Sequence, residues 1–157
     1  MAFPGSRPAR VLYGTSKRVV DELGKGQEVL RKAHARVRGM SASVERAIIL
    51  IPDVDIVVVD VACVGENLSA GDLADVFTPA AFSDAGAAGT RLVTQLTDTE
   101  LADDVVYHAP LLGLNNNRVG AGQPIMLRGE EVGGGTITEI FVEISYILAD
   151  EERSYQG

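Results

Sequence analysis

Residues 46–64, "RAIILIPDVDIVVVDVACV", constrain the fold more than any other part of the sequence. They form two runs of β-branched residues that meet at Pro52 and Asp53, and proline is tolerated at the start or edge of a strand. Simple alternation puts Val57, Val59, Val61 and Cys63 on one face of the second run and Val54, Ile56, Val58, Ala62 and Val64 on the other. One face of an antiparallel sheet in a small domain usually meets solvent. We therefore expect a second sheet to cover one face, and the N-terminal segment or a neighbouring subunit to cover the other.

Residues 122–148, "GQPIMLRGEEVGGGTITEIFVEISYIL", predict a β-hairpin that closes the fold. From Ile140 to Leu148 every second residue is apolar, as a half-buried strand requires. The loop "GEEVGGGT" is rich in glycine, which adopts the positive φ angles of tight turns without steric cost.

The rest of the chain adds short strands and one helix. Strands are predicted over residues 33–38, 91–96 and 104–109. Residues 19–32 fit a short helix or turn, or an a/d coiled-coil seam that contains two glycines. A helix is predicted to begin at Ser69, to bury Leu73, Val76 and Phe77, and to end at Pro79. This succession predicts an all-β fold, a β-sandwich or jelly roll with one short helix.

Charge divides the chain into a basic beginning and an acidic remainder. Residues 1–46 hold ten of the 14 Lys and Arg and four of the 22 acids. We expect an extended basic arm over residues 1–40, a sandwich domain over 41–150 and a polar tail over 151–157. The arm residues expected to contact a partner are Arg7, Arg10, Lys17, Arg18, Arg31, Lys32, Arg36 and Arg38. An acidic body repels a nucleic acid backbone, so nucleic acid is not an expected partner.

No group of residues predicts catalysis, a metal site or a cofactor. Cys63 lies among valines, where a thiol packs in the core and does not react. His34 and His108 stand apart with no nucleophile motif beside them. The acids of residues 98–104 read as a solvated loop or a calcium site. The longest apolar runs fall far short of the about 20 residues that span a bilayer, so no membrane partner is expected.

A polar loop is the remaining candidate for binding. Residues 114–120, "LNNNRVG", fit a turn, because asparagine tolerates left-handed conformations. They also fit a contact loop, because binding residues often lie on long loops. Its candidate contact residues are Asn115, Asn116, Asn117 and Arg118.

The layout resembles a family of tailed-bacteriophage virion proteins, the small β-sandwich head-decoration (cement) or accessory proteins. The resemblance lies in "ERAIILIPDVDIVVVDVACVGENLSAGDL", "TPAAFSDAGAAGT" and "AGQPIMLRGEEVGGGTITEIFVEISYI", in that order, over residues 45–148. It implies a non-enzymatic protein of the virion, assembled in the host cytoplasm. Such a protein binds the major capsid protein or another virion protein, forms a homo-oligomer, most often a trimer, and reinforces the shell.

Two other classes remain open. A receptor- or glycan-binding β-sandwich, such as a tail-fibre tip or carbohydrate-binding module, would use the loop of residues 113–123. Aromatic residues make up only 5% of this sequence, with no tryptophan, which argues against a site that stacks aromatic rings on sugars. A small enzyme on a cupin-like jelly roll would need clustered histidines, which the sequence lacks.

Overall fold

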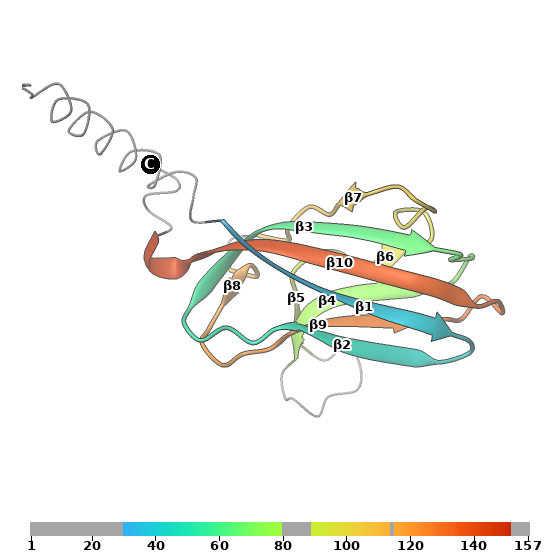
Figure 1. Cartoon of the computed structure of the whole chain (residues 1–157), viewed down its shortest axis with the longest axis horizontal. Coiled ribbons are helices and arrows are strands. Elements are labelled where there is room, and N and C mark those ends of the chain that lie inside the picture. Colours follow the sequence, from blue (N-terminus) through green and yellow to red (C-terminus); the bar gives the residue numbers. More distant parts are fainter. Residues whose placement is uncertain (1–29, 80–88, 114, 152–157) are drawn as a thin grey trace, which may run out of the picture. The chain divides into compact units, whose positions relative to one another are not determined.

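Two antiparallel β-sheets stack face to face, as the computed structural model shows (Figure 1). The structure describes residues 30–79, 89–113 and 115–151, and Arg31–Ala149 belong to one compact unit. The first sheet has the order β1 (Arg31–Met40), β10 (Ile137–Leu148), β3 (Ile56–Glu66) and β7 (Tyr107–His108), with β8 (Arg118–Val119) also paired to β3. The second has the order β2 (Val44–Leu50), β9 (Ile125–Glu130), β4 (Leu73–Pro79) and β5 (Gly89–Arg91), with β6 (Leu96–Thr97) also paired to β4. A 3-10 turn, η1, spans Ala149–Glu151.

The strand pairings are nested, one inside the next. β1 pairs with β10, β2 with β9, β3 with β7 and β4 with β5, as in one long hairpin. Folding that hairpin over adds the pairings of β10 with β3 and of β9 with β4. This order defines a jelly roll, and the predicted all-β sandwich is confirmed.

The core lies between the two sheets. Ile140, Val142 and Ile144 of β10 have no exposed surface, and neither do Ala74, Val76 and Leu127 of the second sheet. Each buried aliphatic side chain of this size contributes about 1.5–3 kcal/mol. Alternation along β10 therefore gives the sandwich its apolar interior, as the sequence predicted for this strand.

A bulge changes which residues of β3 face the core. Opposite Ser145 and Tyr146 the register shifts, and Val59 is left without a partner. One extra residue reverses the inward and outward positions of a strand. The core therefore receives Ile56 and Val58 before the bulge and Val61 and Cys63 after it. The single alternation predicted for this strand was wrong for its first half.

The predicted hairpin over residues 122–148 is wrong, because β9 and β10 lie in different sheets. The connection between them crosses the end of the sandwich and is held by side chains. Glu131 accepts hydrogen bonds from the backbone N–H groups of Ala42 (2.6 Å), Gly134 (2.7 Å) and Gly135 (2.8 Å). Gly133 has to be glycine, because a Cβ there would lie 2.6 Å from the backbone carbonyl oxygen of Ala70, which cannot rotate away as a side chain can.

The predicted helix from Ser69 is also wrong, because Leu73–Pro79 form strand β4. Asp72 does not cap a helix. Its Oδ2 atom accepts a hydrogen bond from the N–H of Ser69 (2.8 Å), and its Oδ1 atom accepts from the N–H groups of Val132 (2.9 Å) and Gly133 (2.8 Å). The sequence did not indicate a strand here because both faces of β4 are buried, so apolar and polar residues do not alternate along it.

Residues 31–40, assigned to the arm from their charge, form strand β1 and belong to the sandwich. The strand predicted over 33–38 is thereby confirmed: Ala35 and Val37 point inward while the cations point outward. The predicted strands at 91–96 and 104–109 form only at their ends, as β5, β6 and β7. The remaining arm contacts, Arg7, Arg10, Lys17 and Arg18, lie outside the described residues, as do most of residues 19–32 and the tail from residue 152.

We expect Asp72→Asn to lower the free energy of unfolding by about 2 kcal/mol at pH 7, because an amide cannot accept all of these N–H donors. Burial raises the pKa of Asp72, but the backbone hydrogen bonds from Ser69, Gly133 and Val132 outweigh it and the pKa is lowered. The stabilisation by the carboxylate is thus complete above the unfolded pKa of about 3.9 and is lost as pH falls through the lower folded value. Urea unfolding at several pH values tests this. The exposed Asp53→Asn variant, whose side chain makes no such contacts, should match the wild type.

Candidate functional site

The cations of β1 form an exposed row along one edge of the first sheet. Arg36 and Arg38 each lie 3.4 Å from a carboxylate oxygen of Glu139, and Lys32 lies 3.5 Å from Glu143. The guanidinium of Arg36 also lies 5.3 Å from the ring centre of Phe141. Exposed ion pairs of this kind contribute at most about 1 kcal/mol. They position the cationic groups on the surface without burying them, and the groups can still meet an acidic partner.

The polar loop between residues 113 and 118 is largely committed to the fold. The side-chain amide of Asn116 donates to the carbonyl of Arg91 (3.0 Å), and that of Asn117 donates to the carbonyl of Val58 (2.9 Å). Asn117 is buried, and its Oδ1 atom has no partner among the described residues. Asn115 and Arg118 are exposed, so a contact role for this loop stays a prediction that rests on those two residues.

A buried carboxylate that sequence reasoning missed lies on the second sheet. Asp75 of β4 has no exposed surface, although its neighbours Ala74 and Val76 are the residues that face the core. Its oxygens accept from Arg91 Nε at 2.7 Å, from Arg128 Nη1 at 3.3 Å and from Gln95 Nε2 at 3.2 Å. The cluster joins β4, β5 and β9. Only the strand register reveals it, because Asp75 faces Arg128 across β4 and β9.

We expect Asp75→Asn to lower the free energy of unfolding by about 3 kcal/mol, because Arg91 loses its carboxylate partner and Arg128 keeps only the partly exposed Glu130. Glu130→Gln is the matched control, since Glu130 also pairs with Arg128, at 2.8 Å, but is partly exposed. The control should lose at most about 1 kcal/mol. Chemical denaturation of both variants measures the difference, and equal losses would contradict a structural role specific to Asp75.

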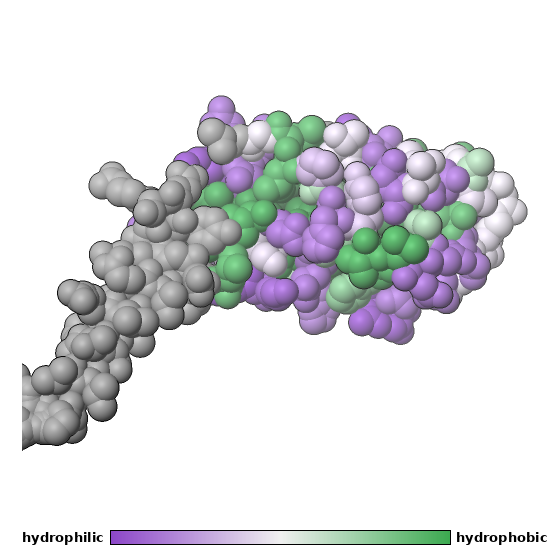
Figure 2. Space-filling model, turned by 90° about the horizontal axis from the view of Figure 1, so that it is seen from above, coloured by the Kyte–Doolittle hydropathy of each residue, from purple (hydrophilic) through white to green (hydrophobic). Residues whose placement is uncertain are grey.

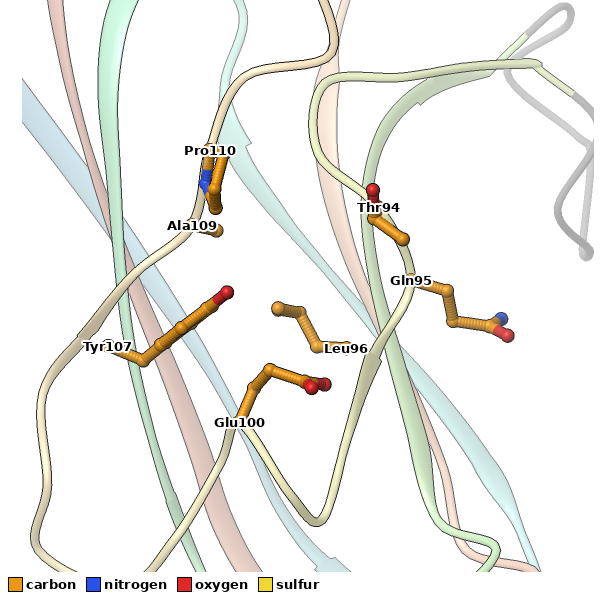
Figure 3. A pocket seen from close by; sticks show the side chains of 7 residues that line it. All are labelled: Thr94, Gln95, Leu96, Glu100, Tyr107, Ala109 and Pro110. Carbon is orange, nitrogen blue, oxygen red and sulfur yellow. The ribbon is translucent and has the colours of Figure 1, made fainter.

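A small crevice opens between the two sheets beside β7. Its volume is about 270 Å³, and its walls include Leu96, Glu100, Tyr107 and Ala109 (Figure 3). The hydroxyl of Tyr107 points into it, whereas Gln95 points away, towards its contact with Asp75. One oxygen of Glu100 accepts from the N–H (2.8 Å) and the hydroxyl (2.9 Å) of Thr97. Binding pockets for small molecules usually measure about 300–1,000 Å³. This crevice falls just below that range, and no histidine or cysteine lines it.

The groups considered for chemistry are separated in the described parts of the chain. His108 Nδ1 lies 3.1 Å from Asp60 on the exposed surface of the first sheet, with no nucleophile in contact. Asp103 accepts from the N–H of Asn67 (2.8 Å) and so holds a loop. Over residues 30–79, 89–113 and 115–151, no three His, Cys, Asp or Glu side chains gather in a way that could hold a metal ion. The same residues contain no helix of the length and apolarity that crossing a membrane would require.

Cys63 is the free cysteine of β3 and lies in the core. Burial, and then the charge of Asp60, raise the pKa of its thiol to about 12. We expect Ellman's reagent to leave Cys63 unmodified at pH 8 in the native protein, because almost no thiolate is present. In guanidinium chloride the same thiol should react fully. Rapid reaction in the folded state would contradict the buried position.

Comparison with known proteins finds likeness at the level of fold. No protein-family model matches the sequence, and no curated protein sequence does. A chain of the structure described as the cyanophage Pam1 capsid asymmetric unit superposes with a TM-score of 0.50 and 12% identity, over 76% of this chain and 84% of that chain. At this identity, the match shows a shared fold that extends over most of both chains.

Two further solved structures score lower. A chain of the acidic stable capsid of Helicobacter pylori bacteriophage KHP30 gives a TM-score of 0.46 at 12% identity, over 77% of this chain and 89% of that chain. A chain of the Bacillus endospore appendages, described as a novel family of disulfide-linked pili, gives 0.38 at 15% identity, over 80% of this chain and 94% of that chain.

Proposed function

We propose that this chain is a non-enzymatic structural protein of a bacteriophage virion, of the decoration (cement) type. It binds the major capsid protein on the outside of the head and reinforces the shell. The observation that carries the proposal is the jelly-roll fold shared, over most of both chains, with a chain of a phage capsid asymmetric unit.

The charged and buried groups of the described residues support a structural role. Asp72, Asp75 and Glu131 are buried, and their oxygens receive hydrogen bonds that hold strands and loops in place. A catalytic carboxylate has instead to meet a substrate in a cleft. These buried polar groups therefore stabilise the fold itself, which suits a protein with a mechanical role.

Electrostatics supply a means of attachment. The first 20 residues carry Arg7, Arg10, Lys17 and Arg18 and no acid. Positive charge on such a segment attracts an acidic protein surface, and a capsid repeats the same surface many times. Repetition multiplies weak contacts, because each bound arm raises the effective concentration of its neighbours at the adjacent sites.

We expect the purified protein to co-sediment with empty heads of the phage that encodes it, and binding to weaken as salt screens the charges. Reversing the arm charges in Arg7→Glu, Arg10→Glu, Lys17→Glu and Arg18→Glu should lower the bound fraction at least tenfold. The matched control is Asn115→Ala, which alters an exposed residue of the polar loop. Undiminished sedimentation of the four-fold variant would contradict attachment through the arm.

The competing function is a receptor- or glycan-binding domain of a tail or fibre, acting through the loop of residues 113–123. In that case Asn115→Ala, not the arm variant, should abolish binding, and the target should be found on a glycan array and not on heads. Absence of sedimentation at low salt, together with specific glycan binding, would replace the capsid proposal with this one.

A further inference from the structure

The two edges of the first sheet carry opposite charge. β1 lies at one edge and β7 at the other. Residues 31–40, which form β1, contain four Lys and Arg and no acid. Residues 96–109, which lead into β7 and include it, contain four acids and neither Lys nor Arg. The four cations of β1 outnumber the two acids of β10 that pair with them, Glu139 and Glu143, so this edge keeps a net positive charge and the β7 side a net negative one.

Each edge also exposes aliphatic side chains. Beside β1 lies the edge strand of the second sheet, β2, and Val44, Ile48 and Ile51 on it or just after it are 42% to 48% exposed. Val105 and Val106, just before β7, are 55% and 60% exposed. Figure 2 looks onto the β7 side and shows apolar patches bordered by polar groups. We name residues 31–51 the basic edge and residues 96–109 the acidic edge.

The basic edge suits a particular kind of neighbour. A strand at the edge of a sheet has unpaired backbone groups, and lysine and arginine on it deter association with another apolar or cationic edge. Contact between two basic edges would oppose like charges, and so would contact between two acidic edges. Only a basic edge against an acidic edge brings opposite charges together while it covers valine and isoleucine on both sides.

We propose that copies of this chain associate head to tail, with the basic edge of one copy against the acidic edge of the next. Because the two surfaces differ and lie on opposite sides of the sandwich, each copy can contact two neighbours. The association is heterologous, and it generates a closed ring where the rotation between copies closes and a filament where it does not. This deepens the proposed function, since a ring would present several arms to the shell, but it can be tested without capsids.

Two surface variants, made in the full-length chain, test the proposal. Ile48→Asp places a charge in the basic edge, and Val106→Asp places one in the acidic edge; both positions are exposed, so the fold should tolerate them. The control is Val132→Asp, whose residue is 57% exposed but lies in the connection between β9 and β10. Circular dichroism and thermal unfolding establish that all three variants are folded. Native mass is then measured by light scattering at about 100 µM, where a contact with a Kd of about 10 µM is largely formed.

We expect the wild type and Val132→Asp to be larger than dimers, and each edge variant to be monomeric. An equimolar mixture of Ile48→Asp and Val106→Asp should form a 1:1 dimer, because one intact basic edge and one intact acidic edge remain. A monomeric wild type, an edge variant that keeps the wild-type mass, or a mixture that stays monomeric would each overturn the proposal.

Charge reversal gives a second, independent measurement. Arg38→Glu and Asp98→Lys should each weaken self-association about tenfold, and an equimolar mixture of the two should recover part of it, because the reversed charges then face each other. If neither substitution changes the dissociation constant, charge complementarity between the edges is refuted. Copies that associate yet fail to bind heads would contradict the proposed function alone, whereas monomers that bind heads would contradict only the head-to-tail contact.

Discussion

The rest of the structure depends on the burial of β10 between β1 and β3. Its inward side chains, Ile140, Val142 and Ile144, are fully covered by the second sheet, and its two neighbours come from the first third of the described chain. The last strand of the fold must therefore find its partners across 73 residues (Glu66 with Glu139) to 115 residues (Arg31 with Tyr146). Such long-range pairing is slow to form, because loop closure costs entropy before the contacts are made. Once β1 and β10 have paired, the strands between them in the sequence are close enough to pair in the nested order.

Crossing from one sheet to the other creates a second requirement, which buried acids meet. The chain crosses between sheets after β1, β2, β3, β6, β8 and β9. At the crossings after β1, β3 and β9, backbone N–H groups lose their strand partners and bond to side chains instead. Glu131 ties the turn after β1 to the connection after β9, and Asp72 ties the connection after β3 to that same segment. A carboxylate accepts several N–H groups at once, which suits it to sites where three loops converge. Some of the acidic residues of this chain therefore hold its loops in place.

Much of the fold could be predicted from the sequence, and most of the failures concern how the strands pair. Runs of apolar, mostly β-branched residues were sufficient to place β2 and β3, and period-two alternation to place β1 and β10, because each of the last two has one apolar face. The same signal could not reveal the bulge at Val59, since valine occupies both faces there. It could not show that β9 and β10 belong to different sheets, because pairing is decided by strands far away in the chain. Asp75 was missed for the same reason: its partners Arg91 and Arg128 become neighbours only through the register. The cations of β1 were correctly predicted to lie on the surface, but because of their charge residues 31–40 were assigned to the arm and not to the sandwich.

The pairing of the first strand with the last also determines where the sandwich joins the rest of the chain. Arg31 lies opposite Tyr146, so the strand that begins the compact unit starts beside the end of the strand that finishes it. Neighbouring ends are the geometry that permits a domain to be inserted into a surface loop of a host protein, or to be circularly permuted, without breaking any pairing. The sandwich can therefore be joined to other segments at one end, where its first strand begins and its last strand ends, while the loops held by Asp72 and Glu131 at the other end stay intact.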